Sequence, residues 1–504
     1  MKTRLLFSAL IVLLQPLSAQ EPMRPAFHFT AEKNWLNDPN GLVHHDGEWH
    51  LFYQYNPFGD TWGHMSWGHA VSRDLLAWEH LPVAIPEKDG VMAFSGSAVV
   101  DHANTSGFGS EGNPPMVAIY TGHREGHQDQ RLSYSTDKGR SWTMFAGNPV
   151  LDIGKADFRD PKVFWHAPTQ RWIMAVVLPV ERKVSLYASK DLKKWDHLSD
   201  FGGSGSVKGV WECPDLFEVP IDGTDRKRWV LSVSVGDHAV AGGSGTQYFT
   251  GEFDGARFIA DPPPLSDAAA NADTARANWI DYGRDMYAGV TWNGVPDGKP
   301  RWIGWMSNLK YAGRTPTKPW RSAMSLPRTL SLREDGGRYT LIQRPVGQPD
   351  DWGLEGLLIS DESLERANAS LREWSGKRFD MTLRIDPGDA AEAGIRLRVG
   401  EGEETLVGWS RAKGEVFVDR TKSGNTGFDA GFSGRHAAPL KLRDGLLELR
   451  IITDDCSVEV FADGGAVVIT DLIFPAESSE GLAFFNEGGK AKIVSAEINV
   501  LGRK

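Results

Sequence analysis

Three acidic residues stand in distinctive local sequences that could support acid–base chemistry. They are Asp38 in Trp-Leu-Asn-Asp-Pro-Asn-Gly, Asp160 in Phe-Arg-Asp-Pro, and Glu212 in Trp-Glu-Cys-Pro-Asp. The first two lie 122 residues apart and the last two 52 residues apart. If one structural repeat spans about 50–65 residues, each acid occupies the same place in a different repeat, and the three converge on a common axis. Two carboxyl groups that face one bond are the minimal apparatus for cleaving a glycoside.

A recurring turn motif indicates a similar period. Segments 72–78, 135–142 and 189–195 each contain a Ser, an Asp two residues later, and then a Trp. Each segment lies between short apolar runs, so we interpret it as a turn between two outer strands. A fixed period of this size in a β-rich chain predicts a β-propeller.

The phase of the repeat predicts two more site positions. One repeat after Asp38 lies Ser95, and one repeat after Glu212 lies Asp281, beyond an apparent insertion. Together with Asp160 these positions predict five blades. We expect each blade to place one of these residues on or just after its innermost strand, around one mouth of the central channel.

The character of the chain changes after the breaker-rich segment Arg-Pro-Val-Gly-Gln-Pro at residues 344–349. Beyond it, apolar and charged residues alternate, as in Leu-Glu-Leu-Arg-Ile at residues 447–451. Short alternating strands with one polar face predict a β-sandwich. The chain is therefore expected to be all-β, with a five-bladed β-propeller over residues 20–345 followed by a C-terminal β-sandwich over residues 346–504. The Pro- and Ala-rich stretch 261–277 is expected to be a surface insertion.

The N-terminus predicts export. Residues 1–19 combine Lys2 and Arg4, a ten-residue apolar stretch too short to span a bilayer, and the small residues expected before a cleavage site. We therefore expect a signal peptide and a periplasmic or extracellular protein without a membrane span. The net charge of −11 is scattered over 504 residues and gives no electrostatic footprint for nucleic acid. Cys213 and Cys456 are expected to be free, buried thiols in different domains.

Several short motifs together resemble glycoside hydrolase family 32, which contains invertases, inulinases, levanases and related fructosyltransferases. The resemblance covers roughly residues 28 to 500 in order, and the family's fold is a five-bladed propeller followed by a sandwich. The segments that carry it are 35–41, 54–57, 62–70, 94–97, 159–161, 212–214, 418–421 and 457–462.

The resemblance implies a retaining mechanism with three acids. Asp38 corresponds to the nucleophile, Glu212 to the general acid/base and Asp160 to the transition-state stabiliser. Arg159 would place a positive charge beside these acids, lower their pKa values and hold Asp160 ionised. The terminal fructose is expected to contact Asn37, Gln54, Trp62, Ser95 and Trp305, and we also place Asp281 and Tyr282 at this site.

The remaining motifs favour no cofactor. His123 and His127 have the spacing of a helical metal pair, but Gly122 and Gly126 disfavour a helix, so no metal site is expected. No Gly-rich loop leads from a strand into a helix, so no nucleotide cofactor is expected.

The leading hypothesis is a β-fructosidase that releases fructose from levan, inulin or sucrose. A sucrose-preferring invertase and a fructosyltransferase remain open, because both use the same acids. A non-catalytic fructan-binding propeller is disfavoured by the cost of burying three acids, and an arabinan- or xylan-active propeller by the settings of Asp38 and Glu212.

Overall fold

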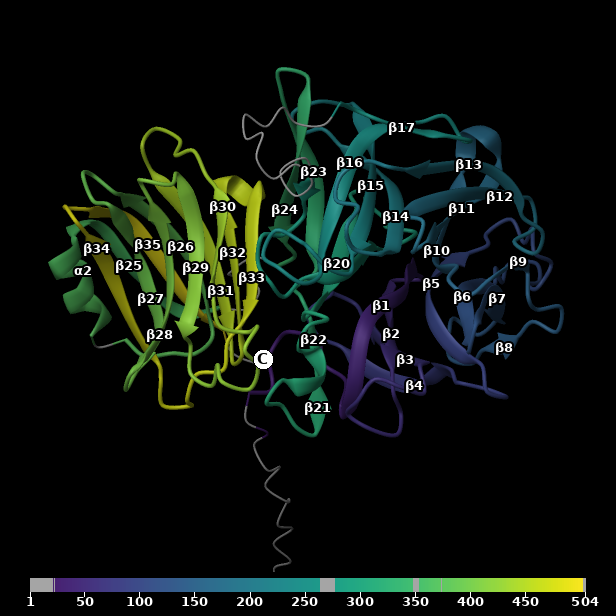
Figure 1. Cartoon of the computed structure of the whole chain (residues 1–504), viewed down its shortest axis with the longest axis horizontal. Coiled ribbons are helices and arrows are strands. Elements are labelled where there is room, and N and C mark those ends of the chain that lie inside the picture. Colours follow the sequence, from purple (N-terminus) through teal and green to yellow (C-terminus); the bar gives the residue numbers. More distant parts are fainter. Residues whose placement is uncertain (1–20, 22, 263–276, 348–352, 373, 502–504) are drawn as a thin grey trace, which may run out of the picture.

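The computed structural model describes residues 21, 23–262, 277–347, 353–372 and 374–501. The predicted signal peptide and most of the predicted insertion lie outside these ranges. Strands dominate the described chain, and they form five sheets of four or five strands followed by two sheets of six and five strands (Figure 1). The prediction of a five-bladed propeller followed by a sandwich is confirmed.

Each of the first two blades is an antiparallel meander whose first long strand lies innermost. Strand β21, from the end of the propeller, pairs in parallel with β1 and closes the ring. The first blade contains β1 (Asn34–His45), β2 (Glu48–Tyr55), β3 (Ser66–Ser72), β4 (Glu79–Ile85) and β21 (Trp320–Arg321). The second contains β5 (Met92–Val100), β6 (Met116–Arg124), β7 (His127–Ser135), β8 (Thr143–Met144) and β9 (Leu151–Lys155).

The other three blades repeat this order, with short 3-10 turns η1 (Ala167–Thr169) and η3 (Ala312–Arg314) between their elements. The third blade contains β10 (Arg159–His166), β11 (Arg171–Leu178), β12 (Lys183–Ser189) and β13 (Asp196–Gly202). The fourth contains β14 (Trp211–Pro220), β15 (Lys227–Val235), β16 (Gly245–Phe253), β17 (Phe258–Ala260) and β18 (Asn278–Trp279). The fifth contains β19 (Tyr287–Thr291), β20 (Arg301–Met306), β22 (Ala323–Met324), β23 (Arg328–Asp335) and β24 (Arg338–Pro345).

The recurring Ser-Asp-Trp motif forms the predicted turn between the third and fourth strands of three blades. In the first of these turns the Ser72 hydroxyl accepts from Leu75 N at 2.8 Å, and Asp74 Oδ1 accepts from Ala77 N at 2.8 Å. Ser135 with Asp137 and Ser189 with Asp191 repeat the arrangement. These side chains satisfy backbone N–H groups that the turn leaves without strand partners.

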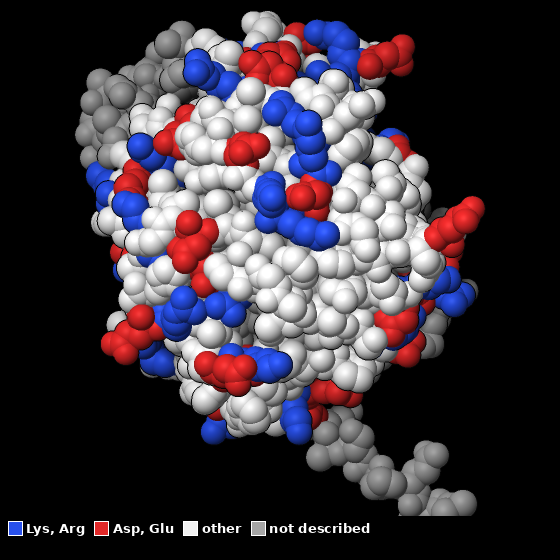
Figure 2. Space-filling model, turned by 90° about the vertical axis from the view of Figure 1, so that its right-hand side faces the viewer, with Lys and Arg blue, Asp and Glu red and all other residues white. Residues whose placement is uncertain are grey.

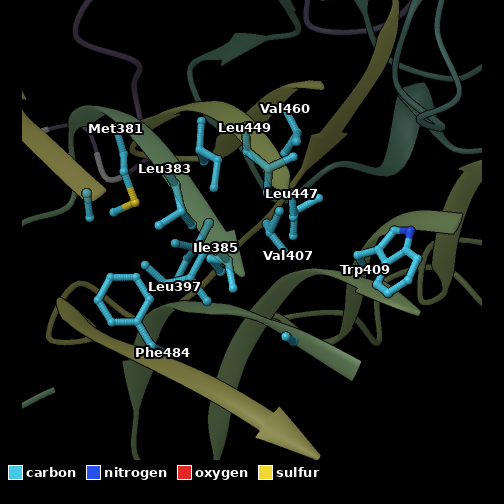
Figure 3. Packing of buried hydrophobic residues seen from close by; sticks show 14 of the residues in the cluster. Met381, Leu383, Ile385, Leu397, Val407, Trp409, Leu447, Leu449, Val460 and Phe484 are labelled. Carbon is cyan, nitrogen blue, oxygen red and sulfur yellow. The ribbon is translucent and has the colours of Figure 1, made fainter. Parts of the chain in front are cut away.

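The C-terminal domain packs two antiparallel sheets face to face around one apolar core (Figure 3). Leu447, Leu449 and Ile451 point into this core, as their alternation predicts. One sheet contains β25 (Gly353–Ser363), β35 (Lys492–Leu501), β26 (Phe379–Asp386), β31 (Leu447–Asp454), β32 (Ser457–Ala462) and β33 (Val467–Leu472). The other contains β30 (Arg435–Pro439), β29 (Glu415–Lys422), β28 (Glu403–Ser410), β27 (Glu392–Gly400) and β34 (Gly481–Glu487), and the remaining elements are α2 (Leu364–Leu371) and η4 (Asp463–Gly465).

The sandwich packs beside the propeller through buried ion pairs. Arg328 of β23 donates to Glu459 at 2.7 Å, and His28 bridges Glu459 and Asp454 at 2.9 and 2.8 Å. A second cluster joins Arg420 of the sandwich to Asp285 of the propeller. Because buried charges are stable only when paired, these contacts define one docking geometry for the two domains.

The distribution of surface charge, the state of the two cysteines and the lengths of the helices bear on the remaining predictions. On the propeller side of the molecule, basic and acidic side chains are interspersed rather than segregated by sign (Figure 2). Cys213 and Cys456 are both free and buried, as predicted. Within the described ranges, no helix is long and apolar enough to cross a membrane.

Candidate active site

The innermost strands of the first two blades position Asp38. The pairing of β1 is interrupted at Asn37 and Asp38, between Leu36 and Pro39, and this bulge turns the Asp38 carboxyl group toward the channel. Asp38 Oδ1 accepts from Asn37 Nδ2 at 3.0 Å, and Oδ2 accepts from the Ser95 hydroxyl on β5 at 2.7 Å. Two donors from two blades therefore fix the rotamer of this carboxylate.

Asp160 lies at an equivalent bulge on β10, where its φ is 64°. Its backbone N donates to Thr121 Oγ1 at 3.0 Å, and its Oδ2 accepts from Cys213 N at 3.0 Å. The Cys213 thiol lies 3.5 Å from Asp38 Oδ2 and 3.7 Å from Asp160 Oδ2. Cys213 thus packs between two acids, consistent with the expectation of a buried, free thiol.

Glu212 begins a third bulge, on β14, and two donors hold its two oxygens. Arg159 Nη2 donates to Oε1 at 2.9 Å, and the Tyr287 hydroxyl donates to Oε2 through a short hydrogen bond. Arg159 is itself held by Asp157, whose Oδ1 lies 2.9 Å from Nη1. The glutamate is therefore oriented from the third and the fifth blade at once.

The three acids open into one cavity of about 530 Å³. The structure brings most of the predicted sugar-binding residues to this cavity: Asn37, Gln54, Trp62, Ser95, Arg159 and Trp305 all line it. The exposed fractions of these side chains differ widely. Gln54 is 2% exposed and Ser95 6%, so they form the buried floor of the cavity, whereas Trp62 is 53% exposed and lies at its mouth. Such a gradient suits a ligand that enters end first.

Asp281 and Tyr282 do not line the cavity, and their predicted placement is wrong. Asp281 is buried between the domains, where it accepts from Arg328 at 3.1 Å and from the Thr470 hydroxyl at 2.7 Å. Tyr282 N donates to Val468 O at 2.8 Å in the sandwich. The segment before β19 therefore pairs with β33 instead of facing the channel.

The fifth blade contributes Tyr287, which the sequence argument missed. It opens β19 and lies 75 residues after Glu212, so the insertion lengthened the spacing more than expected. A bulge signal was present, because Ala288-Gly289 interrupts β19 as Asp160-Pro161 interrupts β10. Further cavity-lining residues that were not predicted are Trp35, Phe94, His123, Gln128, Asp157, Leu309, Ala312 and Gly313.

Burial is the largest influence on the pKa values of Asp38 and Asp160. Burial raises the pKa of Asp38, and the Glu212 charge adds to this, whereas the hydrogen bonds from Ser95 and Asn37 oppose it. Burial also raises the pKa of Asp160 to about 7. Arg159 lowers the pKa of Asp160, as expected, but this effect is smaller than that of burial. The expectation that Arg159 holds Asp160 ionised is therefore wrong below about pH 7.

The two histidines with metal-like spacing separate in the structure. They lie on the adjacent strands β6 and β7, which confirms that this segment is not helical. His123 lines the cavity, whereas His127 lies near Asp129 and Asp152 outside it. Asp129 is already paired with Arg131 at 2.6 Å.

Comparison with known proteins identifies the family to which this chain belongs. The family model described as "Glycosyl hydrolases family 32 N-terminal domain" matches residues 28–345, and that described as "Glycosyl hydrolases family 32 C terminal" matches residues 358–500. The chain belongs to glycosyl hydrolase family 32, as its motifs suggested.

Individual relatives agree over nearly the whole chain. A levanase of Bacillus subtilis (strain 168) is 49% identical over 493 residues, which cover 95% of this chain and 71% of the relative. An extracellular exo-inulinase of Aspergillus awamori is 38% identical, covering 95% and 94% of the two chains. A crystal structure of exo-inulinase from that species superimposes with a TM-score of 0.87 at 36% identity, covering 96% of this chain and 99% of that one. A fructofuranosidase from Schwanniomyces occidentalis, complexed with fructosylnystose, gives a TM-score of 0.85 at 32% identity over 95% and 98%.

Proposed function

We propose that this protein is an exported, retaining β-fructosidase that removes terminal fructosyl units from fructans. The observation that carries the proposal is the set of three acids in one cavity, each oriented by donors from neighbouring blades. The named activities of the levanase and exo-inulinase relatives support fructans as the substrate class.

The chemistry follows from the two oriented carboxyl groups. Asp38 attacks the anomeric carbon of the fructosyl unit while Glu212 gives its proton to the departing glycosidic oxygen. Glu212 then takes a proton from water, whose oxygen displaces Asp38 and releases fructose with retained configuration. Such a mechanism requires the carboxyl groups of Asp38 and Glu212 to lie about 5–5.5 Å apart.

The remaining side chains fit this sequence of steps. Asp160 faces the same space and is proposed to hold sugar hydroxyl groups as positive charge develops on the ring. Asn37 and Gln54 offer hydrogen bonds at the buried floor, while Trp62 and Trp305 offer apolar ring faces. A floor of buried side chains favours a chain end over the middle of a polymer, so we propose exo-action.

Incubation with sucrose, inulin and levan in separate reactions tests the proposal. Free fructose as the only small product from either polymer is the expected result. A ladder of oligomers would indicate endo-attack, and longer products would indicate fructosyl transfer. Strong cleavage of sucrose with negligible action on both polymers would support an invertase instead. Recovery of the protein from the culture medium or periplasm, with its N-terminus beginning near Gln20, tests export.

A further inference from the structure

His123 occupies the mouth of the cavity without a role in the chemistry described above. It lies near the end of β6, and its ring stacks on Phe94 with centroids 4.3 Å apart and planes 10° apart. Trp62 meets Phe94 edge-on, with ring centroids 5.9 Å apart. The three rings form a wall on the side of the cavity that the first two blades provide.

The hydrogen-bond network determines which nitrogen of His123 carries the proton. Gln128 Oε1 accepts from the backbone N of Phe158 at 2.7 Å, and a backbone N–H can only donate. Gln128 Nε2 is therefore the donor to His123 Nδ1, 3.2 Å away, so Nδ1 supplies a lone pair. Burial and the Arg159 charge lower the pKa of His123, which favours the neutral ring. The single ring proton then resides on Nε2.

The same hydrogen-bond network links His123 to Glu212, which is proposed to protonate the leaving group. Gln128 Oε1 also accepts from Arg159 Nη1 at 3.4 Å, and Arg159 holds Glu212. From Glu212 this path leads through Arg159 and Gln128 to His123, which is half-buried, whereas the partners of Asp38, Asn37 and Ser95, are buried. If Glu212 protonates the leaving oxygen, the sugar unit attached to that oxygen lies toward the mouth and this wall.

We propose that His123 is a specificity-determining residue, whose Nε2–H donates to a hydroxyl group of the sugar unit released as the leaving group. The inference rests on the proposed function and deepens it. Nδ1 is occupied by Gln128, so the donor is fixed in direction before the substrate arrives. An alcohol leaving group without a second sugar ring offers no acceptor at this position.

The test compares two substrates in matched variants. The ratio of kcat/KM for an inulin-type trisaccharide to kcat/KM for methyl β-D-fructofuranoside isolates recognition of the second unit. His123→Phe keeps a ring against Phe94 but removes the donor, and should lower this ratio about two- to tenfold, as expected for one neutral hydrogen bond. His123→Gln places an N–H near the position of Nε2 and should restore much of the ratio. His127→Phe, on the neighbouring strand outside the cavity, is the control and should keep the ratio.

The outcomes separate this inference from the proposed function. An unchanged ratio in His123→Phe, or an equal loss in His123→Gln, would overturn the role of the donor. A parallel loss on both substrates, with the ratio preserved, would also overturn it and indicate an effect through Arg159 and Glu212. If wild-type protein hydrolyses neither substrate, the proposed function fails instead. Should His123→Phe not fold, as judged by its melting temperature, His123→Asn serves as the variant whose amide is too short to reach the Nε2 position.

Discussion

The pKa of Asp160 makes the stability of the protein depend on pH. Asp160 is 6% exposed and faces the cavity that also contains Asp38 and Glu212. Burial, assisted by those two charges and opposed by Arg159, raises its pKa from 3.8 to about 7. Between these values the folded protein keeps a proton that the unfolded chain has released. Raising the pH across this window therefore lowers the free energy of unfolding.

The size of this effect follows from the shift. Three pKa units correspond to roughly 4 kcal/mol, lost as the pH rises from about 4 to about 7. Asp160→Asn keeps the shape and an oxygen to accept from Cys213 N, but it cannot ionise. The variant should lose nearly all turnover, and its free energy of unfolding should decline less steeply across this window than that of wild type.

Denaturant unfolding at pH 4.5, 6 and 7.5 measures the difference. Asp335→Asn, at an exposed position on β23, is the matched control and should follow wild type. Parallel pH dependence in Asp160→Asn and wild type would refute the reasoning, because it would mean that Asp160 titrates alike in the folded and unfolded states. A steeper decline in the variant would contradict the sign of the shift.

Three further sets of substitutions test the site and the domain interface: at the acids Asp38 and Glu212, at Tyr287, and at Asp281. Asp38→Asn and Glu212→Gln should each reduce kcat by at least about 10²–10⁴-fold while the protein stays folded. Azide should rescue Glu212→Ala on a fructoside with a good leaving group but not Asp38→Ala, and the reverse pattern would mean that the roles are exchanged. Tyr287→Phe removes a donor to Glu212 and should lower kcat/KM on fructans about tenfold while affecting the activated fructoside less; equal losses on both substrates would argue against a role in protonating the leaving group. Asp281→Asn should lower the free energy of unfolding by about 1–3 kcal/mol, because it weakens the buried hydrogen bonds to Arg328 and Thr470 while Glu459 still pairs with Arg328. The kcat/KM of the folded protein should stay near wild type, and a selective loss of kcat/KM would return Asp281 to the active site.

The sequence was sufficient to predict the blades that contain distinctive local motifs. Asp38, Asp160 and Glu212 each stand beside a Pro or a Cys-Pro within a strand, a context that is uncommon in regular strands and typical of bulges. The Ser-Asp-Trp turns gave an independent indication of where each structural repeat lies along the chain. The alternating pattern of the sandwich was equally readable, because one buried face requires it.

Contacts between distant segments could not be read in the same way. Gln128 has no distinctive local sequence. In the fold it nevertheless forms hydrogen bonds both to His123 on the neighbouring strand β6 and to Arg159 in another blade. Asp281 fell at the expected phase and resembled a site acid, but its partners are Arg328 and Thr470, which lie 47 and 189 residues away. A buried acid needs a charge partner wherever it lies, so acidity and phase alone do not separate a catalytic position from an interface position.

A structural device shared by all five innermost strands explains both the success and the error. Each of these strands has a register shift at the cavity, and the residue pairs within the shifts are Asn37-Asp38, Phe94-Ser95, Asp160-Pro161, Cys213-Pro214 and Ala288-Gly289. In the first two strands a Pro or a Gly, Pro39 or Gly96, follows the shift directly. A Pro lacks the N–H that the ladder requires, and a Gly leaves room for close approach, since a Cβ on Gly289 would lie 1.8 Å from Trp302. The bulge turns the local side chain into the channel regardless of its type, so the fifth blade presents Tyr287 directly before its shift, as the fourth blade presents Glu212. The repeat is thus better traced by its Pro and Gly breaks than by its carboxylates, and those breaks place the fifth innermost strand at Tyr287 rather than at Asp281.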